Sequence, residues 1–506
     1  MMMPEAQVTS GFCLAALLKG LAEASPLADE VAVTGLSQDA QSVAPGDLFL
    51  AVRGRRTHGL RYVDQALARG AAAVVWEPDS EIASPRVSKN IPVIALPELR
   101  QRLGLIADRF FNHPSRDLTV IGVTGTDGKT SVSHFLAQAL DTPGKPCGLI
   151  GTLGYGLNGR LRLATHTTPD VIRLHAELAA MRSQGAKAAV MEVSSHALDQ
   201  HRVNGVAMDV AVLTNLTRDH LDYHVDVSAY AAAKRRLFEL PGLRRAILNT
   251  DDAFGLELAQ LLRAPLEVLG YSLGNPPLHA LPMVRATRIE SMLSGLRFEV
   301  QTSVGSGRVE SRLLGRFNVN NLLAALGVLL ALGMPLRQAL LRLGHTRGVP
   351  GRMEGHGGGD KPLVVVDYAH TPAALAQVLI ALREHCRGRL RCVFGCGGDR
   401  DRGKRPLMAR VAEQHADEAI VTDDNPRTEP PTTIIRDMLK GFSDPSRIAV
   451  IQDRARAIAY AVSRARGGDV VLVAGKGHEQ VQIVGEQACP FNDSRVVESV
   501  LSEHQL

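Results

Sequence analysis

Short apolar runs that end abruptly in glycine or polar residues recur along most of this chain. In its middle part, Thr119–Val123, Ala188–Met191 and Val210–Leu213 are such runs, separated by helical stretches such as Ser131–Leu140 and Val171–Gln184. Strands that are apolar on both faces and alternate with helices are typical of a parallel sheet covered on both sides. The polar segments after the strands should then meet at one edge of the sheet, where such proteins bind ligands.

The same rhythm predicts three α/β regions in the 506 residues. A first, small region combines Asp47–Arg53 and Ala71–Trp76 as strands with a helix near Tyr62–Gly70. A third series of runs comprises Leu363–Val366, Arg391–Phe394, Ala419–Val421 and Asp469–Val473. Between the second and third series, Arg285–Gln301 alternates like antiparallel strands and Leu322–Met334 reads as a buried helix. We therefore expect domains at residues 1–98, 99–347 and 348–506.

Composition excludes several classes of protein. Lys and Arg (57) exceed Asp and Glu (52) by only five over the whole length, so no nucleic-acid partner is expected. The six cysteines are scattered, which argues against a disulfide scaffold, and Cys392 and Cys396 read as buried thiols rather than zinc ligands. Residues 1–10 lack a targeting pattern, and the longest apolar run is too short to span a membrane. We expect a soluble, cytoplasmic protein.

A glycine-rich loop, Gly125-Thr-Asp-Gly-Lys-Thr130, lies between a predicted strand and a predicted helix. Backbone N–H groups and the helix N-terminus there can bind phosphate, Lys129 adds positive charge, and the Thr130 hydroxyl can reach Mg²⁺. The spacing departs from the standard form, since Val123 stands where a glycine is usual. A plain glycine turn with a surface lysine is the alternative, but the strand-to-helix context favours an ATP or GTP site.

Candidate metal ligands follow the neighbouring strands. Mg²⁺ is a hard cation, and Glu192 and His220 come directly after two further apolar runs. Either residue alone would suit a structural role, whereas three consecutive strand ends with such residues favour a site. Lys234 lies in the helical run Tyr230–Phe238 and, read by periodicity, is a solvated helix lysine.

The last region has charged loops of its own. Arg400 lies in a glycine-rich, basic loop, and Arg427 follows a predicted strand. Because planar guanidinium groups bind carboxylates in pairs of hydrogen bonds, these two residues indicate an anionic substrate. Glu479 could hold an ammonium group, so the set suits an amino acid. The alternative is that these charged loop side chains face solvent and bind no substrate.

Taken in order, these segments resemble the Mur ligase family over nearly the whole chain. The motifs that carry the resemblance are Gly46-Asp-Leu-Phe49, Val123–Thr130, Thr167-Thr-Pro169, Glu192-Val-Ser-Ser-His196, Thr214–His220, Gly315-Arg-Phe-Asn318, Asp367-Tyr-Ala-His370 and Asp424-Asn-Pro-Arg427. The resemblance implies a small N-terminal α/β domain for a UDP-sugar, a central P-loop ATPase domain with a mainly parallel sheet, and a C-terminal Rossmann-like α/β domain for an amino acid. Within the family it is closest to the members that add meso-diaminopimelate to UDP-N-acetylmuramoyl-L-alanyl-D-glutamate.

The resemblance also implies roles for individual residues. ATP is expected at Gly125, Thr126, Asp127, Gly128, Lys129, Thr130, Ser131, Asn318, Arg352 and Asp367, and the UDP-muramoyl dipeptide at Gln38, Ala40, Thr167, Thr168, Ser194, Gln200 and Arg202. Diaminopimelate is expected at Arg400, Asp424, Asn425, Pro426, Arg427, Gly475 and Glu479. Mg²⁺ is expected at Thr130, Glu192, His220 and Lys234, with Lys234 carbamylated by CO₂ to N6-carboxylysine. Lys129, Glu192, His220 and Lys234 are the expected catalytic residues.

The implied reaction is an ATP-dependent ligation through an acyl phosphate, carried out by a monomer on small-molecule substrates. Arg427 favours a substrate with a distal carboxylate and opposes the ammonium end of lysine. Ligases that add lysine, or glutamate to folate, are the nearest alternatives. A nucleotide switch is a more distant one, and the chain lacks the Asn-Lys-x-Asp motif that a GTPase would need.

Three positions depart from the family pattern. Asp127 stands where Asn is usual, Ala40 where Ser is frequent, and His166 where Asn is frequent. Asp127 adds negative charge near ATP unless its side chain points outward. The other two weaken individual sugar-nucleotide contacts and leave the expected reaction class unchanged.

Overall fold

The computed structural model describes residues 11–22, 26–54, 57–80, 83–85, 87, 90–220, 223–262, 264–274 and 281–503. Residues 1–10, which are predicted to lack a targeting pattern, lie outside this described part of the chain. The chain forms two compact units, one made of residues 1–270 and 278–281 and the other of residues 271–277 and 282–506. The predicted boundaries at 98 and 347 stay predictions.

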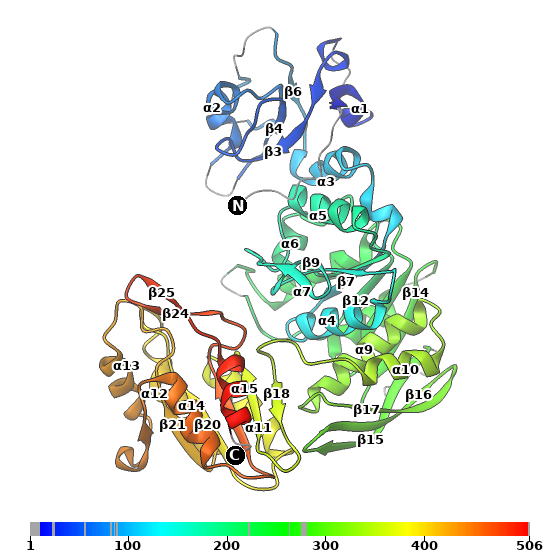
Figure 1. Ribbon diagram of the computed structural model, residues 1–506. Coiled ribbons are helices and arrows are strands. Elements are labelled where there is room, and N and C mark those ends of the chain that lie inside the picture. Colours follow the sequence, from blue (N-terminus) through cyan, green and yellow to red (C-terminus); the bar gives the residue numbers. More distant parts are fainter. Residues whose placement is uncertain are drawn as a thin grey trace. The chain divides into compact units, whose positions relative to one another are not determined.

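The first unit begins with a small parallel sheet in the order β3-β4-β5-β6 (Figure 1). Its strands are β3 (Gly35–Ser37), β4 (Asp47–Ala51), β5 (Ala73–Trp76) and β6 (Val93–Ala95), preceded by the pair β1 (Phe12–Cys13) and β2 (Ala32–Val33). The helices are α1 (Leu14–Leu18), α2 (Val63–Ala68) and α3 (Leu99–Phe110), with 3₁₀ turns at Pro26–Asp29 and Gly59–Tyr62. The predicted strand-helix-strand pattern is confirmed, and buried side chains fill both faces of this sheet.

The rest of the first unit is built on a larger sheet in the order β10-β9-β8-β11-β7-β12-β13-β14. Its strands are β7 (Thr119–Thr124), β8 (Cys147–Gly151), β9 (Gly154–Leu157), β10 (Arg160–Arg162), β11 (Ala188–Glu192), β12 (Val210–Leu213), β13 (Arg245–Asn249) and β14 (Glu267–Ser272). The helices are α4 (Lys129–Leu140), α5 (Val171–Ser183), α6 (Ser195–Asp199), α7 (Val227–Arg235) and α8 (Ala253–Leu261), with 3₁₀ turns at Pro114–Asp117 and Arg236–Glu239. The neighbouring strands β8, β11, β7, β12 and β13 are parallel, as predicted, whereas β9 and β10 pair antiparallel.

The register of this sheet brings the predicted polar segments together. Glu192 pairs with Val123, and Leu213 pairs with Thr124, so β11, β7 and β12 end at the same level. The glycine-rich loop therefore lies between Glu192 on one side and Thr214 on the other. Convergence of these strand ends at one edge is confirmed.

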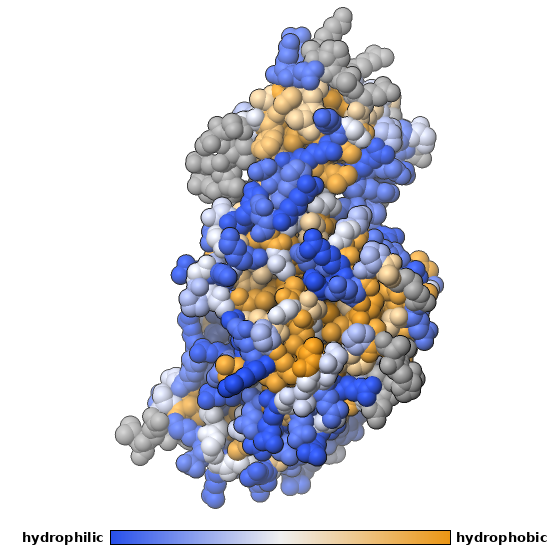
Figure 2. Space-filling view, turned by 90° about the vertical axis from the view of Figure 1, so that its right-hand side faces the viewer, coloured by the Kyte–Doolittle hydropathy of each residue, from blue (hydrophilic) through white to orange (hydrophobic). Residues whose placement is uncertain are grey.

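The second unit begins with an antiparallel meander and two helices. Its strands are β15 (Met283–Met292), β16 (Gly295–Thr302) and β17 (Gly305–Ser311), followed by α9 (Phe317–Ala331) and α10 (Leu336–Gly344). Both the alternating segment and the buried helix are confirmed. The face of the molecule that carries α10 exposes apolar side chains (Figure 2), among them Leu341, which is 63% exposed. A groove of about 820 Å³ there is lined by β17 and α10, and none of its lining residues belongs to the predicted site.

The C-terminal part of the second unit is a sheet in the order β18-β19-β23-β20-β21-β22 with helices on both faces (Figure 1). Its strands are β18 (Glu354–Gly357), β19 (Leu363–Asp367), β20 (Leu390–Phe394), β21 (Glu418–Val421), β22 (Ala449–Val450) and β23 (Val470–Ala474), with the hairpin β24 (Val481–Val484) and β25 (Gln487–Pro490). The helices are α11 (Pro372–Arg383), α12 (Lys404–His415), α13 (Pro431–Leu439), α14 (Arg454–Ser463) and α15 (Asp493–Glu503), with a 3₁₀ turn at Pro445–Arg447. All neighbours are parallel except β18.

Cys392 and Cys396 are buried in this core as thiols, as predicted, and burial raises the pKa of both. All six cysteines are unbridged. Among the described residues, no helix has both the length and the apolar character needed to cross a membrane.

Candidate active site

The glycine-rich loop connects the end of β7 to the first residue of α4. Gly125 and Gly128 adopt positive φ angles of 148° and 81°, and a Cβ on Gly125 would lie 1.8 Å from the Thr214 hydroxyl oxygen. Glycine is therefore required at this close approach. The Lys129 ammonium donates to the carbonyl oxygens of Gly125 (2.9 Å) and Thr126 (2.8 Å). The loop thus has the strand-loop-helix geometry of a phosphate-binding loop.

The segment after β12 holds this loop in place. The Thr214 hydroxyl donates to the carbonyl oxygen of Asp127 (2.6 Å), and the Asn215 side-chain oxygen accepts from the Asp127 N–H (2.9 Å). These bonds use the backbone of Asp127, and its side chain is exposed. The unusual carboxylate consequently does not enter the loop's hydrogen-bond network.

Glu192 is fully buried at the end of β11, directly beside the phosphate loop. Its carboxylate accepts from the Thr130 hydroxyl (2.8 Å) and from the backbone N–H of Thr152 (2.8 Å). Burial raises the pKa of Glu192, although the Thr152 and Thr130 hydrogen bonds and the Lys129 charge oppose this rise. Carboxylate and hydroxyl oxygens beside a phosphate loop are hard donors of the kind that Mg²⁺ prefers.

Lys234, on α7, is buried rather than solvated, with 1% of its surface exposed. The predicted helix is confirmed, but the prediction from periodicity that Lys234 faces solvent was wrong, because α7 turns this residue toward the phosphate loop. Its amine donates to the Gly125 carbonyl oxygen (2.7 Å) and lies 4.4 Å from the centre of the Tyr230 ring. Burial, with a smaller contribution from the Lys129 charge, lowers the pKa of Lys234 to about 6. The side chain is therefore mostly an uncharged amine at neutral pH.

His220 lies on the segment after β12 and is exposed, with its ring 4.9 Å from the ring of His196. Its Nε2 lies 3.5 Å from an Asp219 carboxylate oxygen. Among the described residues no group of three or more His, Cys, Asp or Glu side chains is placed to hold a metal ion. The predicted magnesium ligands could not form a group of that kind, because only two of them, Glu192 and His220, are His, Cys, Asp or Glu residues.

Five of the seven residues predicted to hold the UDP-muramoyl dipeptide form a connected network next to Glu192. The Thr168 hydroxyl donates to the Glu192 carbonyl oxygen (2.8 Å) and accepts from the Ser194 N–H (3.1 Å). Arg202 donates to the Thr168 carbonyl oxygen (2.9 Å) and to the Gln200 side-chain oxygen (2.6 Å). Thr167 joins the same network through Thr152, because the hydroxyl oxygens of these two threonines lie 3.1 Å apart.

The two predicted sugar-nucleotide residues of the small sheet differ in exposure. Gln38 is half-buried, whereas the Ala40 methyl group is buried among apolar side chains that include Val43 and Phe49. A ligand contact at position 40 would therefore use the backbone. His166 is exposed, and its carbonyl oxygen accepts a hydrogen bond from the Tyr155 hydroxyl.

Three predicted nucleotide residues belong to the second unit. The Asn318 amide donates to the Leu314 carbonyl oxygen (2.7 Å) and accepts from Asn321 (2.8 Å), at the start of α9. Asp367, at the end of β19, accepts from the backbone N–H groups of Met353 and Ala369, each at 2.8 Å. The Arg352 guanidinium lies 5.0 Å from the centre of the Tyr368 ring.

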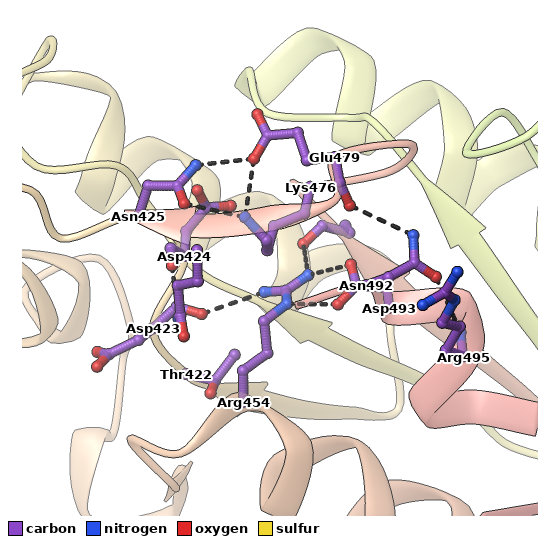
Figure 3. A network of polar contacts seen from close by, with 12 residues as sticks. Thr422, Asp423, Asp424, Asn425, Arg454, Lys476, Glu479, Asn492, Asp493 and Arg495 are labelled. Atoms are coloured by element: carbon purple, nitrogen blue, oxygen red, sulfur yellow. Dashed lines mark hydrogen bonds and ion pairs between the residues drawn. The ribbon is translucent and has the colours of Figure 1, made fainter. Parts of the chain in front are cut away.

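The predicted amino-acid residues gather where β21 and β23 end (Figure 3). The Asn425 amide donates to the Glu479 carboxylate (2.8 Å). Asp424 is buried, and a Cβ on Gly475, whose φ angle is 121°, would lie 2.5 Å from its carboxylate, so a side chain there would be strained and would displace Asp424. Pro426 is also buried. Polar groups of both signs therefore line this edge of the sheet.

Arg427 continues from this cluster with a φ angle of 52°. Its guanidinium donates to the Gly398 carbonyl oxygen (2.9 Å), which brings it to the loop that carries Arg400. A Cβ on Gly397 would lie 2.9 Å from the Arg427 guanidinium and 3.6 Å from the Arg400 side chain. The two arginines that the sequence predicts to bind a carboxylate thus lie on adjoining loops, and Arg400 is exposed.

Sequence reasoning missed several residues that organise these sites. Thr152 contacts Glu192, Tyr230 contacts Lys234, and Lys476 contacts Asn425 and Glu479. Thr152 follows the end of β8, so it could have been found as a fourth polar strand end. Lys476 follows the end of β23 and could have been found in the same way. Tyr230 carries no such signal, since a tyrosine in its position fits an ordinary helix pattern.

A phosphate loop beside a buried carboxylate, with a second charged cluster on a separate parallel sheet, defines a nucleotide-dependent α/β enzyme with a charged co-substrate. The sequence models of three known domain families match consecutive parts of the chain. They are "Mur ligase family, catalytic domain" at residues 32–111, "Mur ligase middle domain" at 123–329 and "Mur ligase, glutamate ligase domain" at 351–477.

Curated relatives extend this likeness over nearly the full length. Proteins of Coxiella burnetii and Pseudomonas aeruginosa, each named UDP-N-acetylmuramoyl-L-alanyl-D-glutamate--2,6-diaminopimelate ligase, are both 50% identical to this chain. The matches cover 92% and 94% of this chain and 95% and 96% of the relatives. The chain belongs to the Mur ligase family, as its motifs predicted.

Solved structures agree. One described as UDP-N-acetylmuramoyl-L-alanyl-D-glutamate--2,6-diaminopimelate ligase is 37% identical, with a TM-score of 0.77 over 98% of this chain and 100% of that chain. MurF ligase from Thermotoga maritima, solved in complex with ADP, is 19% identical, with a TM-score of 0.57 over 92% of this chain and 96% of that one. The second similarity shows the fold alone. The predicted three-domain α/β architecture of this family is confirmed.

Proposed function

We propose that this protein catalyses the ATP-dependent addition of meso-diaminopimelate to the D-glutamate of UDP-N-acetylmuramoyl-L-alanyl-D-glutamate, a step of peptidoglycan precursor synthesis. The observation that carries this proposal is the name shared by relatives that are 50% identical over at least 92% of the chain. The charged cluster around Arg427 and Glu479 supports it, because it offers both a cation and an anion to an amino acid.

The proposed chemistry proceeds in two steps. The side-chain carboxylate of the D-glutamyl residue attacks the γ-phosphorus of ATP, which forms an acyl phosphate and releases ADP. The amine of diaminopimelate then attacks the acyl carbon, and the tetrahedral intermediate expels phosphate and loses a proton to give the amide. Lys129 and the N–H groups of residues 125–131 would neutralise the charge that develops on the phosphate oxygens.

Mg²⁺ is the metal that this site suits best. The donors that we assign to it are the Thr130 hydroxyl, the Glu192 carboxylate, His220 and a modified Lys234. The adjacent oxygens of Thr130 and Glu192 fit a hard cation of this kind. When bound, the ion would act as a Lewis acid toward the phosphate oxygens.

We further propose that Lys234 is carbamylated. A neutral amine reacts with CO₂ to give a carbamate and a proton, and the lowered pKa of Lys234 supplies the amine in neutral form. The product would place an additional anionic oxygen donor next to the phosphate loop, where the Lys234 amine now donates to the Gly125 carbonyl oxygen. The proposed magnesium site then holds two carboxylate-type ligands, one hydroxyl and the His220 imidazole.

The remaining binding roles are assigned by the family pattern. Asn318, Arg352 and Asp367 would contact the nucleotide in addition to the phosphate loop. The UDP-muramoyl dipeptide would contact Gln38, Ala40, Thr167, Thr168, Ser194, Gln200 and Arg202. Diaminopimelate would contact Arg400, Asp424, Asn425, Pro426, Arg427, Gly475 and Glu479. We assign the sugar, ATP and amino-acid roles to residues 1–98, 99–347 and 348–506, respectively.

The partners that this function requires are small molecules. We place the reaction in the cytoplasm, since ATP and UDP-linked precursors are made there, and we propose a monomer with neither a nucleic-acid nor a membrane partner. The modest net charge of +5 supports the exclusion of nucleic acid.

The test is ATP-dependent phosphate release by the purified full chain with the UDP-muramoyl dipeptide and each of three acceptors: meso-diaminopimelate, lysine or none. We expect release with diaminopimelate, together with a tripeptide product seen by mass spectrometry. Equal turnover with lysine would refute the amino-acid assignment. Phosphate release that does not depend on the acceptor would refute the ligase assignment.

A further inference from the structure

Lys476 is the least expected residue of the amino-acid cluster, because its side chain is fully buried, with 0% of its surface exposed. It follows β23 between Gly475 and Gly477, whose φ angles of 121° and 52° turn the chain sharply. Buried lysines are rare unless their charge is paired. The surroundings of its ammonium group must therefore compensate for its removal from water.

The ammonium group has three N–H donors, and three acceptors surround it. Two of them are the side-chain oxygen of Asn425 (2.9 Å) and the carboxylate of Glu479 (2.8 Å) (Figure 3). The third is the carbonyl oxygen of Val481 (2.7 Å). Every donor of the lysine is thus in use. Lys476 has no N–H left for a substrate and must act through its neighbours.

The first neighbour whose orientation it determines is Asn425. Only the oxygen of an amide can accept from an ammonium group, so the contact with Lys476 fixes which way the Asn425 amide faces. The same oxygen accepts from the backbone N–H of Ile483 (2.9 Å). One amide N–H donates to Glu479 at 2.8 Å, and the other has no acceptor among the described residues. Asn425 can therefore offer a ligand a donor and not an acceptor.

The second neighbour is Glu479, whose Oε2 accepts from both Lys476 and Asn425, each at 2.8 Å. Its Oε1 has no hydrogen-bond donor within the described part of the chain. Burial alone would raise the pKa of Glu479, but the hydrogen bonds from Lys476 and Asn425 outweigh burial and lower it. The carboxylate is thus held in one orientation with one charged oxygen available.

We propose that Lys476 is a positioning residue that presents an amide donor of Asn425 and a carboxylate oxygen of Glu479 to an incoming amino acid. This inference rests on the proposed function. The donor suits a substrate carboxylate and the acceptor suits its ammonium group, so the pair matches a zwitterionic end of diaminopimelate. Arg454 supports the same edge, since its buried guanidinium pairs with Asp493 (2.7 Å) and donates to the Ala474 carbonyl oxygen (3.0 Å).

The test compares wild-type protein with Lys476→Met, which keeps the length of the side chain and removes its three donors. We expect the KM for diaminopimelate to rise about 30-fold or more, since three hydrogen bonds to a charged group are lost. The KM values for ATP and for the UDP-muramoyl dipeptide should stay within about two-fold. Lys440→Met, which removes an ammonium group whose side chain is 65% exposed, is the matched control and should behave as wild type.

Two further measurements separate positioning from general damage. Without Lys476 the pKa of Glu479 should rise, so the acid limb of kcat/KM for diaminopimelate should move to higher pH. In a Glu479→Gln background, Lys476→Met should cost much less than it does in wild type. If Lys476→Met does not fold, Lys476→Gln, which keeps an N–H donor, should show the same pattern with about a 10-fold rise in KM.

The outcomes distinguish the two proposals. Wild-type protein without acceptor-dependent phosphate release would refute the proposed function and this inference together. With wild-type activity present, the inference alone fails if the KM for diaminopimelate is unchanged, if all three KM values rise in parallel, or if the two substitutions multiply in the double variant.

Discussion

The Lys234 amine and the Lys129 ammonium donate to the same atom, the carbonyl oxygen of Gly125, at 2.7 and 2.9 Å. Two lysine nitrogens around one oxygen repel each other if both are charged, and Lys234 is the more deeply buried of the two. Lys234 is therefore the lysine of this pair whose amine is uncharged. A neutral, buried amine next to a phosphate loop is unsuited to binding phosphate and well suited to reaction with CO₂.

Removing CO₂ should accordingly lower the activity. We expect wild-type turnover, measured as phosphate release, to fall several-fold in degassed, CO₂-depleted buffer and to recover when bicarbonate is added. Lys234→Met should be at least about 100-fold less active with or without bicarbonate, because it can form no carbamate ligand. Arg235→Met, an exposed neighbour on α7, serves as the control. Activity that ignores bicarbonate while Lys234→Met is inactive would leave Lys234 important but unmodified.

Glu192 should be required for the metal-dependent step. Glu192→Gln keeps the shape of the side chain, but it removes the negative charge and turns an amide donor toward either Thr130 or the Thr152 N–H. We expect kcat to fall by about 10²–10³ and the Mg²⁺ concentration for half-maximal rate to rise. Glu239→Gln, at an exposed carboxylate, should change neither quantity. A normal magnesium requirement in Glu192→Gln would remove this residue from the proposed metal site.

The sequence predicted the elements at this site well because buried parallel strands have an unambiguous pattern. β7, β11 and β12 lie within a residue or two of the predicted runs, and parallel pairing then requires that their polar ends converge. The order of the strands in space was not predictable from apolar runs alone. That order decides that Glu192 and Thr214 flank Gly125.

Residues on helices and loops were harder to predict. Lys234 sits on an amphipathic helix whose pattern does not distinguish a lysine facing water from one facing a phosphate loop, and only the family resemblance assigned it a role. Lys476 escaped notice because a lysine between two glycines is typical of an exposed turn. Lys234 is buried against the distant phosphate loop. Lys476 combines nearby acceptors on Glu479 and Val481 with the distant Asn425, and its turn-like local pattern does not reveal this burial.

Arg427 should determine the choice between diaminopimelate and lysine. Its φ angle of 52° lies in the left-handed region, so Arg427→Asn is the gentler substitution, since asparagine tolerates that conformation. We expect the ratio of kcat/KM for diaminopimelate over lysine to fall about 100-fold, because a charge-assisted pair of hydrogen bonds to the distal carboxylate is lost. Arg436→Asn, exposed on α13, is the control. An unchanged ratio would assign carboxylate recognition to another residue such as Arg400.

The ion pair of Arg405 and Glu429 should stabilise the loops around Arg427, and this stabilisation should depend on pH. Arg405 is completely buried and donates to both Glu429 carboxylate oxygens, at 2.8 and 2.6 Å. These bonds lower the pKa of Glu429 to about 2. Because the pKa is lower in the folded than in the unfolded protein, the pair stabilises fully above pH 4.5, the ordinary value, and loses this effect as the pH falls toward 2.

Glu429→Gln should therefore be less stable than wild type at pH 7, by about 1–2 kcal/mol, with a difference that shrinks as the pH falls below 4.5. Urea unfolding at a series of pH values measures this. Glu486→Gln, at an exposed position in the β24–β25 turn, should follow the wild-type curve. A difference that stays constant down to pH 2 would mean that the loss comes from packing rather than from the charge.

Gly104 should be essential for the junction between α3 and the turn at residues 201–206. Within an ordinary helix, alanine is more stable than glycine by about 1 kcal/mol. Here a Cβ would lie 1.9 Å from the backbone oxygen of Asn204, which is itself held by His175 (3.1 Å) and by the Asn204 side-chain bond to Gln101 (2.9 Å). The backbone cannot yield cheaply, so Gly104→Ala should destabilise the protein by about 2–3 kcal/mol and lower its Tm. Gly348→Ala, whose Cβ would meet nothing closer than 3.9 Å, is the control. A Gly104→Ala protein as stable as wild type would show that α3 can move away from this turn.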